Sequence, residues 1–113
     1  MQAGLSEISI DLTEFNKLKK LLIKHEIPFE ERTIDGIKGY EHHQIIYPCD
    51  GEQRKSDAVI GLGTYGYQHG LLEQMGLIPQ DECLDDVQGW LDAETIFKRW
   101  AEDFGFFVKG MDI

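Results

Sequence analysis

Apolar residues recur every three or four positions between Asp11 and His25, which is the spacing of one face of an α-helix. The apolar positions are Leu12, Phe15, Leu18, Leu21 and Leu22. Asp11 can accept hydrogen bonds from the first turn, Glu14 can complete a capping box, and Pro28 prevents the helix from continuing. The pattern therefore predicts a helix over residues 11–25 with one buried face.

A second stretch with the same spacing runs from Ala93 to Phe104. Its apolar positions are Ala93, Ile96, Phe97, Trp100 and Phe104. Asp92 precedes the stretch as a candidate N-cap, and Gly105 follows it at a position where glycine commonly ends a helix. These signals predict a helix over residues 93–104.

Two β-prone runs, Phe29–Ile34 and Ile37–Tyr47, flank Asp35-Gly36, a dipeptide that suits the positive φ angles of a tight hairpin turn. Residues 57–60 predict a third short strand. Antiparallel pairing of this strand with the second one would extend the hairpin into a meander.

Leu71, Leu72 and Met75 can lie on one side of a short helix that ends at Gly76, and residues 77–88 are typical of an irregular acidic loop. The expected fold is one small α+β domain over residues 1–113, with residues 1–10 as a flexible lead-in. Its three-stranded antiparallel meander packs with the N-terminal and the C-terminal helix. The expected core is Leu18, Leu22, Ile46, Val59, Ile60, Ile96, Phe97 and Trp100.

The chain has 113 residues, of which 42% are hydrophobic, and this suffices for one domain without a disulfide or a structural metal. It contains Cys49 and Cys83; free thiols are the commoner state inside cells, and their pairing stays open. No signal peptide is recognisable, and no apolar run is long enough to cross a bilayer. We therefore expect a cytoplasmic protein with no membrane partner and no cofactor.

The formal net charge of −10 is concentrated in the second half of the chain. Residues 1–56 contain ten acidic and eight basic residues, whereas residues 57–113 contain eleven acidic and three basic residues. This balance argues against direct binding of nucleic acid, which requires a basic face. It is compatible with a protein partner that presents a basic surface, and equally with an ordinary solvated acidic surface.

Residues 61–66 match the G-x-G-x-x-G pattern of dinucleotide-binding turns and follow a predicted strand. The context does not fit that fold, because no β-type run follows before the acidic loop. A glycine-rich connection packed against the helices is the simpler interpretation. We expect neither a nucleotide nor a metal ion at this segment.

The four histidines do not form a metal-binding pattern. His42 and His43 are adjacent in a predicted strand, so their side chains should point to opposite faces. His69 and Glu73 are an i,i+4 pair that could bind a ligand or simply interact. We expect no metal site and no catalytic residue, but a small enzyme built around His69 stays open as an alternative.

Aromatic and acidic residues gather around the predicted acidic loop and form the candidate binding site. Tyrosine and tryptophan are favoured at interfaces because they combine a large contact area with a polar group. The candidate binding residues are Tyr65, Tyr67, His69, Asp81, Glu82, Asp85, Asp86 and Trp90.

Several short motifs between Ile27 and Phe104 resemble a family of small uncharacterised proteins encoded by phages and prophages of gut Firmicutes. The motifs are Ile45-Ile46-Tyr47-Pro48, Asp57-Ala58-Val59-Ile60, Gly63-Thr64-Tyr65-Gly66, Gly70-Leu71-Leu72-Glu73, Met75-Gly76-Leu77 and Asp86-Val87-Gln88-Gly89-Trp90-Leu91 before Ala93-Glu94. Thr64 and Asp92 stand where the family pattern has serine and threonine. The resemblance implies no activity and no site; it implies a phage setting.

The sequence thus predicts a small acidic phage-type protein that binds and modulates a host or phage protein. In that case its location would be the cytoplasm of the host cell. A second hypothesis is an acidic nucleic-acid mimic that inhibits a nuclease or another DNA-binding protein. The oligomeric state stays open.

Overall fold

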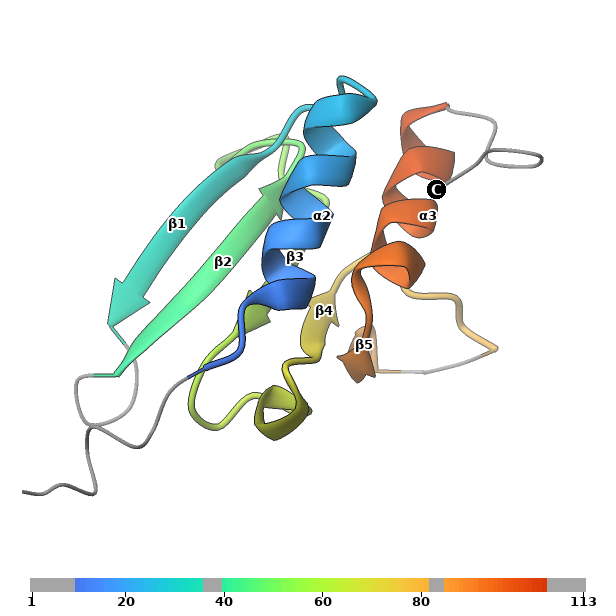
Figure 1. The fold of residues 1–113 in the computed structure, drawn as a ribbon. Helices are drawn as coiled ribbons and strands as arrows, with labels where there is room; N and C mark the ends of the chain where they lie inside the picture. Colours follow the sequence, from blue (N-terminus) through green and yellow to red (C-terminus); the bar gives the residue numbers. More distant parts are fainter. Residues whose placement is uncertain (1–9, 36–39, 82–84, 106–113) are drawn as a thin grey trace, which may run out of the picture.

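The structure, a computed structural model, describes residues 10–35, 40–81 and 85–105. Within these ranges, seven regular elements and one 3-10 turn follow each other (Figure 1). They are α2 (Thr13–Lys24), β1 (Glu30–Asp35), β2 (Glu41–Tyr47), β3 (Ser56–Ile60), η2 (Tyr67–His69), β4 (Leu72–Met75), β5 (Val87–Leu91) and α3 (Ala93–Phe104).

The five strands form one sheet in the order β1-β2-β3-β4-β5, and every neighbouring pair is antiparallel. The two helices lie side by side on the same face of this sheet (Figure 1). The expected α+β fold with two helices is therefore confirmed. The expected three strands are wrong, because the meander continues through β4 and β5.

β4 replaces the short helix that was expected after Gly70. Its four residues alternate between buried and more exposed positions, which is the period of a strand. Leu72 lies on the core face and pairs with Leu91 of β5. In a stretch of four residues, Leu72 and Met75 are also three positions apart, so the helical and strand periods could not be separated from the sequence.

β5 was missed because its sequence lacks a strand alternation. It contains Gly89, and its pairing with β4 is irregular between Leu72 and Gln74. The residues before it were expected to be an irregular loop as far as Gln88. The strand in fact begins at Val87.

The core lies between the helices and the sheet. Of the eight expected core residues, seven are buried, namely Leu18, Leu22, Ile46, Ile60, Ile96, Phe97 and Trp100. Val59 is only half-buried, because it points to the face of β3 that the helices do not cover. Phe104, at the last turn of α3, is 47% exposed, so the apolar stripe of this helix ends at Trp100 and Ala101.

The ends of the helices follow the sequence signals closely. Asp92 accepts a hydrogen bond from the Thr95 N–H at 2.9 Å, and Gly105 ends α3 with φ 97°. At the start of α2 the N-cap residue is Leu12 and not the expected Asp11, although the Asp11 side chain accepts a hydrogen bond from the Thr13 N–H at 2.9 Å. Glu14 does not close the expected capping box, because its Oε1 accepts the Ala93 N–H of α3 at 2.8 Å and so links the two helices.

Ion pairs cross the other face of the sheet. Asp50, in the β2–β3 connection, pairs with Arg32 of β1 at 3.4 Å and with Arg54 at 3.8 Å. Arg54 in turn binds Asp57 of β3. The connection therefore folds back over this face, where Ile46 is fully buried although it does not belong to the core between helices and sheet.

Some expectations fall on residues outside the described ranges. These are the lead-in apart from its last residue, Ile10, the centre of the hairpin turn at Gly36, and the site residue Glu82. Cys83 also lies there, and Cys49 is a half-buried free thiol. Within the described ranges, no helix combines the length and the apolar character needed to span a membrane.

Candidate binding surface

The glycine-rich segment forms the tight connection between β3 and β4. Thr64 closes a turn on Gly61, because its hydroxyl lies 2.9 Å from the Gly61 oxygen and 3.1 Å from the Gly61 nitrogen. Gly66 and Gly70 flank η2 in left-handed conformations, with φ of 97° and 71°. Because β3 and β4 are antiparallel neighbours, the segment is not the strand-to-helix turn of a dinucleotide-binding unit.

A bulge in β5 shapes the surface next to this connection. Leu72 pairs with Leu91 and Gln74 with Gln88, so two residues of β5, Gly89 and Trp90, lie opposite the single intervening residue of β4. Trp90 has a left-handed backbone with φ 61°. Bulges of this kind redirect side chains and are common beside functional sites.

The bulge and the connection are fitted closely to each other. The Trp90 N–H donates to the Tyr65 carbonyl at 3.2 Å. A Cβ atom at Gly89 would lie 2.2 Å from the Tyr65 Cβ, so only glycine leaves room for Tyr65 there. Backbone contacts on both sides thus fix the place of Tyr65 and Trp90.

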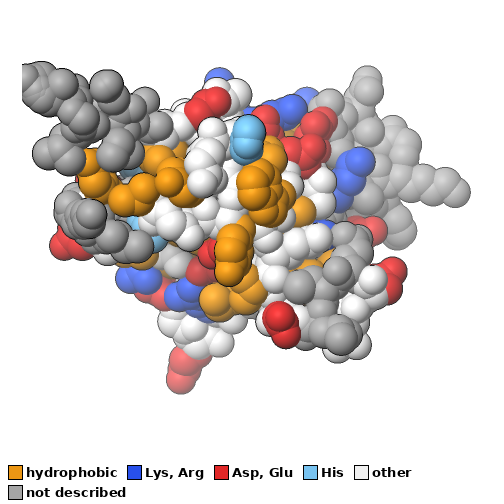
Figure 2. All heavy atoms as spheres, turned by 90° about the horizontal axis from the view of Figure 1, so that it is seen from below, with side chains coloured by type: hydrophobic (Ala, Val, Ile, Leu, Met, Phe, Trp, Pro, Cys, Tyr) orange, Lys and Arg blue, Asp and Glu red, His pale blue; other side chains and the backbone are white. Residues whose placement is uncertain are grey.

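Tyr65, His69 and Trp90 come from the segments that are joined here, and we call them the aromatic platform. The rings of His69 and Trp90 are 5.5 Å apart with an interplanar angle of 40°. Tyr65 is 64% exposed and Trp90 is 56% exposed. Figure 2 shows hydrophobic side chains and a histidine gathered in the middle of this face, with acidic side chains near them.

The structure brings together three of the four aromatic and histidine residues selected from the sequence. The fourth, Tyr67, is half-buried and packs against the hydrophobic core. Its position in η2 turns it away from the solvent-exposed group. Tyr67 therefore contributes to packing against the core and offers little contact area to a partner.

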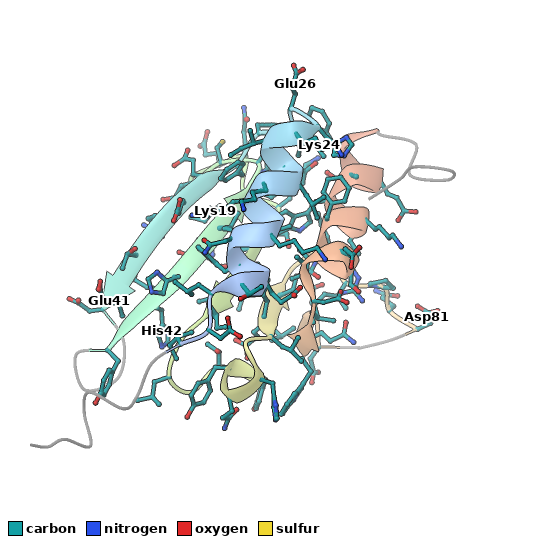
Figure 3. All side chains as sticks on the ribbon, in the orientation of Figure 1. Lys19, Lys24, Glu26, Glu41, His42 and Asp81 are labelled. Atoms are coloured by element: carbon teal, nitrogen blue, oxygen red, sulfur yellow. The ribbon has the colours of Figure 1, made fainter. Side chains whose placement is uncertain are left out.

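The four selected acidic residues do not join the platform as a group. Asp81 lies at the outer end of the β4–β5 connection and points away from the protein (Figure 3). Asp85 is exposed, and Asp86 accepts the Ile78 N–H with its side chain at 3.3 Å and the Gly76 N–H with its carbonyl at 2.9 Å. Asp86 therefore shapes the connection, while Asp81 and Asp85 face solvent.

Two other carboxylates contact the backbone around the platform and were not among the candidate binding residues, although Glu73 was considered as a partner of His69. Glu73 of β4 accepts the Tyr65 N–H at 3.2 Å. Asp11 lies against Gly70, where a Cβ atom would be 3.0 Å from Asp11 Oδ2. The hydroxyl and the N–H of Thr13 donate to Asp11 Oδ1 and hold the pKa of this carboxyl below its usual value. Glu73 could have been placed only by recognising β4 as a strand.

The other histidines lie apart from the platform. His43 packs edge-on against Phe15 on the helix face, whereas His42 Nε2 is 3.0 Å from the Leu62 carbonyl oxygen, so the two adjacent rings point to opposite faces as expected. In the described part of the chain, no three His, Cys, Asp or Glu side chains are grouped as metal ligands.

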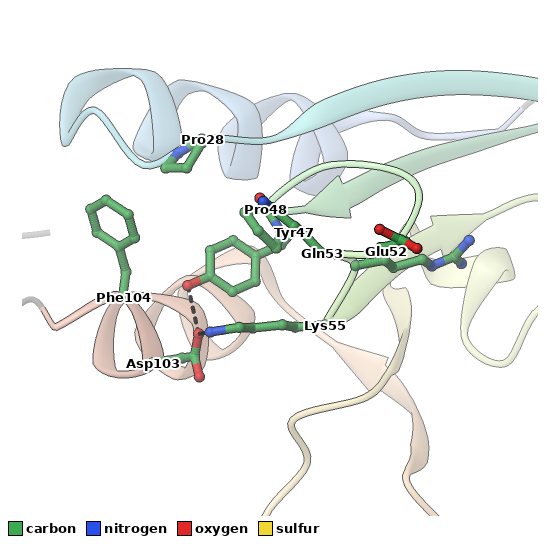
Figure 4. A pocket seen from close by; sticks show the side chains of 9 residues that line it. Pro28, Tyr47, Pro48, Glu52, Gln53, Lys55, Asp103 and Phe104 are labelled. Atoms are coloured by element: carbon green, nitrogen blue, oxygen red, sulfur yellow. Dashed lines mark hydrogen bonds and ion pairs between the residues drawn. The ribbon is translucent and has the colours of Figure 1, made fainter.

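A cavity of about 500 Å³ opens at the far end of the protein, between the β2–β3 connection and the end of α3 (Figure 4). Asp103 accepts hydrogen bonds from the Tyr47 hydroxyl at 2.7 Å and from Lys55 Nζ at 3.0 Å. Burial, with a further contribution from Asp103, raises the pKa of Tyr47 well above its usual value. Partial burial works to raise the pKa of Asp103, but the bonds from Tyr47 and Lys55 outweigh it and lower this pKa.

Replacing Asp103 with asparagine should lower the free energy of unfolding by about 1–2 kcal/mol at neutral pH, because a charged acceptor of two hydrogen bonds is lost. A carboxyl group whose pKa is lowered by folding stabilises the folded state above its unfolded pKa. This contribution disappears as the pH falls through the folded pKa. The difference between the two proteins should therefore shrink below about pH 4. Urea unfolding at several pH values measures it, and a difference that stays constant down to acidic pH would contradict the assignment.

Comparison with known proteins identifies no relative: no family model, no curated protein and no solved structure matches this chain. The function must therefore be argued from the surface itself. The aromatic platform and the cavity at Asp103 are the two features to weigh. The platform is the more informative, because Trp90 combines a left-handed backbone with an exposed side chain.

Proposed function

We propose that this chain is a small acidic binding protein that engages another protein through the aromatic platform. The sequence resemblance described above suggests a host or phage protein as the partner. Two observations support this proposal. Tyr65 and Trp90 are exposed on closely fitted backbones, and the second half of the chain is acidic. Tyrosine and tryptophan are the side chains that most often dominate binding energy at protein interfaces.

The conformation of Trp90 is the observation that carries the proposal. A left-handed backbone costs an L-residue about 1–2 kcal/mol, and glycine would avoid this cost. The indole also gains little by burial, because the side chain is more than half exposed. A bulky residue kept in a strained and exposed position is better explained by a contact outside the chain than by folding.

The acidic residues would contribute mainly to the rate of association. Asp81 and Asp85 are exposed on the β4–β5 connection and would attract a basic surface over a distance. The aromatic side chains would mainly slow dissociation, since they are the parts that become buried. The two kinds of residue are thus expected to affect different rate constants.

The two alternative functions remain predictions. A nucleic-acid mimic needs its carboxylates along one rigid face, whereas Asp81, Asp85 and Asp86 lie on an irregular connection. An enzyme built around His69 needs a concave site. Three cavities among the described residues, of about 500, 360 and 370 Å³, are not lined by His69.

Affinity capture from a lysate of the presumed host, followed by binding assays with the purified partner, tests the proposal. Replacing Trp90 with alanine should weaken binding at least about thirtyfold, as expected for a residue at the centre of an interface. Ile23→Ala is a matched control, because Ile23 is 65% exposed on α2 and lies outside the platform. Its affinity should stay within about twofold of the wild type.

Changing Asp81, Glu82, Asp85 and Asp86 to amides should slow association at low salt and matter less at moderate salt. Two results would overturn the proposal. One is an unchanged set of captured proteins with Trp90→Ala and Tyr65→Ala. The other is turnover of a small molecule that depends on His69.

A further inference from the structure

We infer that the aromatic platform binds an arginine side chain of the partner protein. This inference rests on the proposed function and adds the chemistry of the group that is recognised. It is carried by two features that occur together at the platform: exposed aromatic faces and carboxylates that lack a cation. Neither feature alone would identify the ligand.

The two exposed aromatic side chains of the platform can bind a flat cation. Tyr65 and Trp90 are exposed on adjoining backbones joined by the bond between the Trp90 N–H and the Tyr65 carbonyl. His69 packs on one side of the indole and leaves the side chain of Trp90 more than half open. Indole and phenol rings carry negative charge density on their faces and attract cations, with tryptophan the strongest.

The carboxylates beside the platform have no positive partner within the described residues. The ion pairs among the described residues lie elsewhere: Lys17–Glu94, Lys19–Glu31, Arg32–Asp50, Arg54 with Asp50 and Asp57, and Lys55–Asp103. Within the same ranges, Glu73 accepts a hydrogen bond from the Tyr65 N–H, and Asp11 accepts two from Thr13. Glu73 therefore adds a negative charge at Tyr65, and Asp11 adds one at Gly70, the residue after His69.

Arginine fits these groups better than the other candidates do. Its guanidinium is planar, stacks on aromatic faces and donates to carboxylate oxygens from the same plane, whereas the ammonium of lysine is a strongly hydrated point charge. A purely apolar partner would bury Glu73 against a surface that cannot donate a hydrogen bond, which is unfavourable. The geometry therefore selects a guanidinium.

The probe is the capped peptide Ac-Gly-Arg-Gly-NH2, compared with the same peptide carrying citrulline, which keeps the shape and loses the charge. The chain has two tryptophans, and Trp100 is fully buried, so its indole N–H signal is an internal reference in ¹H–¹⁵N spectra. The arginine peptide should shift the Trp90 indole signal in a saturable way and leave Trp100 unchanged. Citrulline should bind about threefold to tenfold more weakly.

Glu73→Gln tests the carboxylate. The amide oxygen can still accept the Tyr65 N–H, so the fold of the connection should persist while the charge is removed. We expect the arginine peptide to bind this variant about threefold or more weakly. Glu31→Gln is the control, because Glu31 lies on β1 and pairs with Lys19 of α2. This substitution should leave peptide binding unchanged.

Equal shifts with arginine and citrulline, or shifts confined to the β4–β5 connection, would overturn the inference. If that happens while Trp90→Ala still abolishes capture of the partner, the platform binds some other group and the proposed function stands. If Trp90→Ala leaves capture intact, the proposed function itself fails. The two failures are therefore distinguishable.

Discussion

Replacing Trp100 with alanine is expected to lower the free energy of unfolding by about 3–5 kcal/mol, the usual cost of truncating a fully buried aromatic residue. Trp100 is 0% exposed, and its ring stacks on that of Tyr47 at 5.3 Å with an interplanar angle of 13°. This stack joins α3 to β2. A small domain is stable by about 5–15 kcal/mol, so the variant should be close to unfolding at physiological temperature.

Trp100→Phe is the control that separates packing from polarity. The indole Nε1 is buried and finds no acceptor within the described ranges, so phenylalanine removes an unsatisfied donor while keeping an aromatic ring. We expect a loss of less than about 2 kcal/mol. Urea unfolding followed by circular dichroism measures both variants. A loss as large as that of alanine would show that the indole N–H has a partner that matters for stability.

The helices were predictable because their signals are local. Asp92 and Gly105 mark the two ends of α3, and the apolar positions between them recur with the helical period. The first two strands were predictable for the same reason, since two β-prone runs follow each other and pair as a hairpin. The expected two-residue turn at Asp35-Gly36 is wrong, because Asp35 itself pairs with Glu41 of β2. In each case, one short segment contains all the information that decides its structure.

The end of the sheet was not predictable in this way. β4 has only four residues, a length at which helical and strand periods cannot be separated. β5 has a bulge at Gly89 and Trp90, which breaks the alternation expected of a strand. β4 depends on pairing with β3, and β5 depends on pairing with β4. Both pairings are tertiary contacts that no single segment contains.

The candidate site shows the same division. Tyr65, His69 and Trp90 were selected from residue type alone, but their grouping requires the bulge and the antiparallel return of β4. Glu73 was considered only as an i,i+4 partner of His69 in an expected helix, and Asp11 only as a helix cap, so neither was among the candidate binding residues. Residue type identified the aromatic anchors, whereas only the fold identified the charges next to them.

Replacing Gly76, the residue after β4, with alanine is expected to destabilise the fold strongly. Gly76 has φ 83°, and a Cβ atom would lie 2.3 Å from the carbonyl oxygen of Lys55, the residue before β3. The Gly76 carbonyl also accepts a bond from Gln74 Nε2 at 2.8 Å, which satisfies a fully buried side chain. Relief of the clash would therefore separate β3 from β4 and remove a hydrogen-bond acceptor from the buried amide of Gln74.

We expect Gly76→Ala to lower the free energy of unfolding by about 2–5 kcal/mol, as the sum of left-handed strain and overpacking. Gly51→Ala isolates the first term, because Gly51 has φ 98° and nothing lies within 4 Å of the added Cβ. That variant should lose only about 1–2 kcal/mol. Urea unfolding of both proteins gives the difference, which is the steric part. Equal losses would mean that the backbone at Gly76 moves away from Lys55 at no cost, and that β3 and β4 are held together less tightly than their contacts indicate.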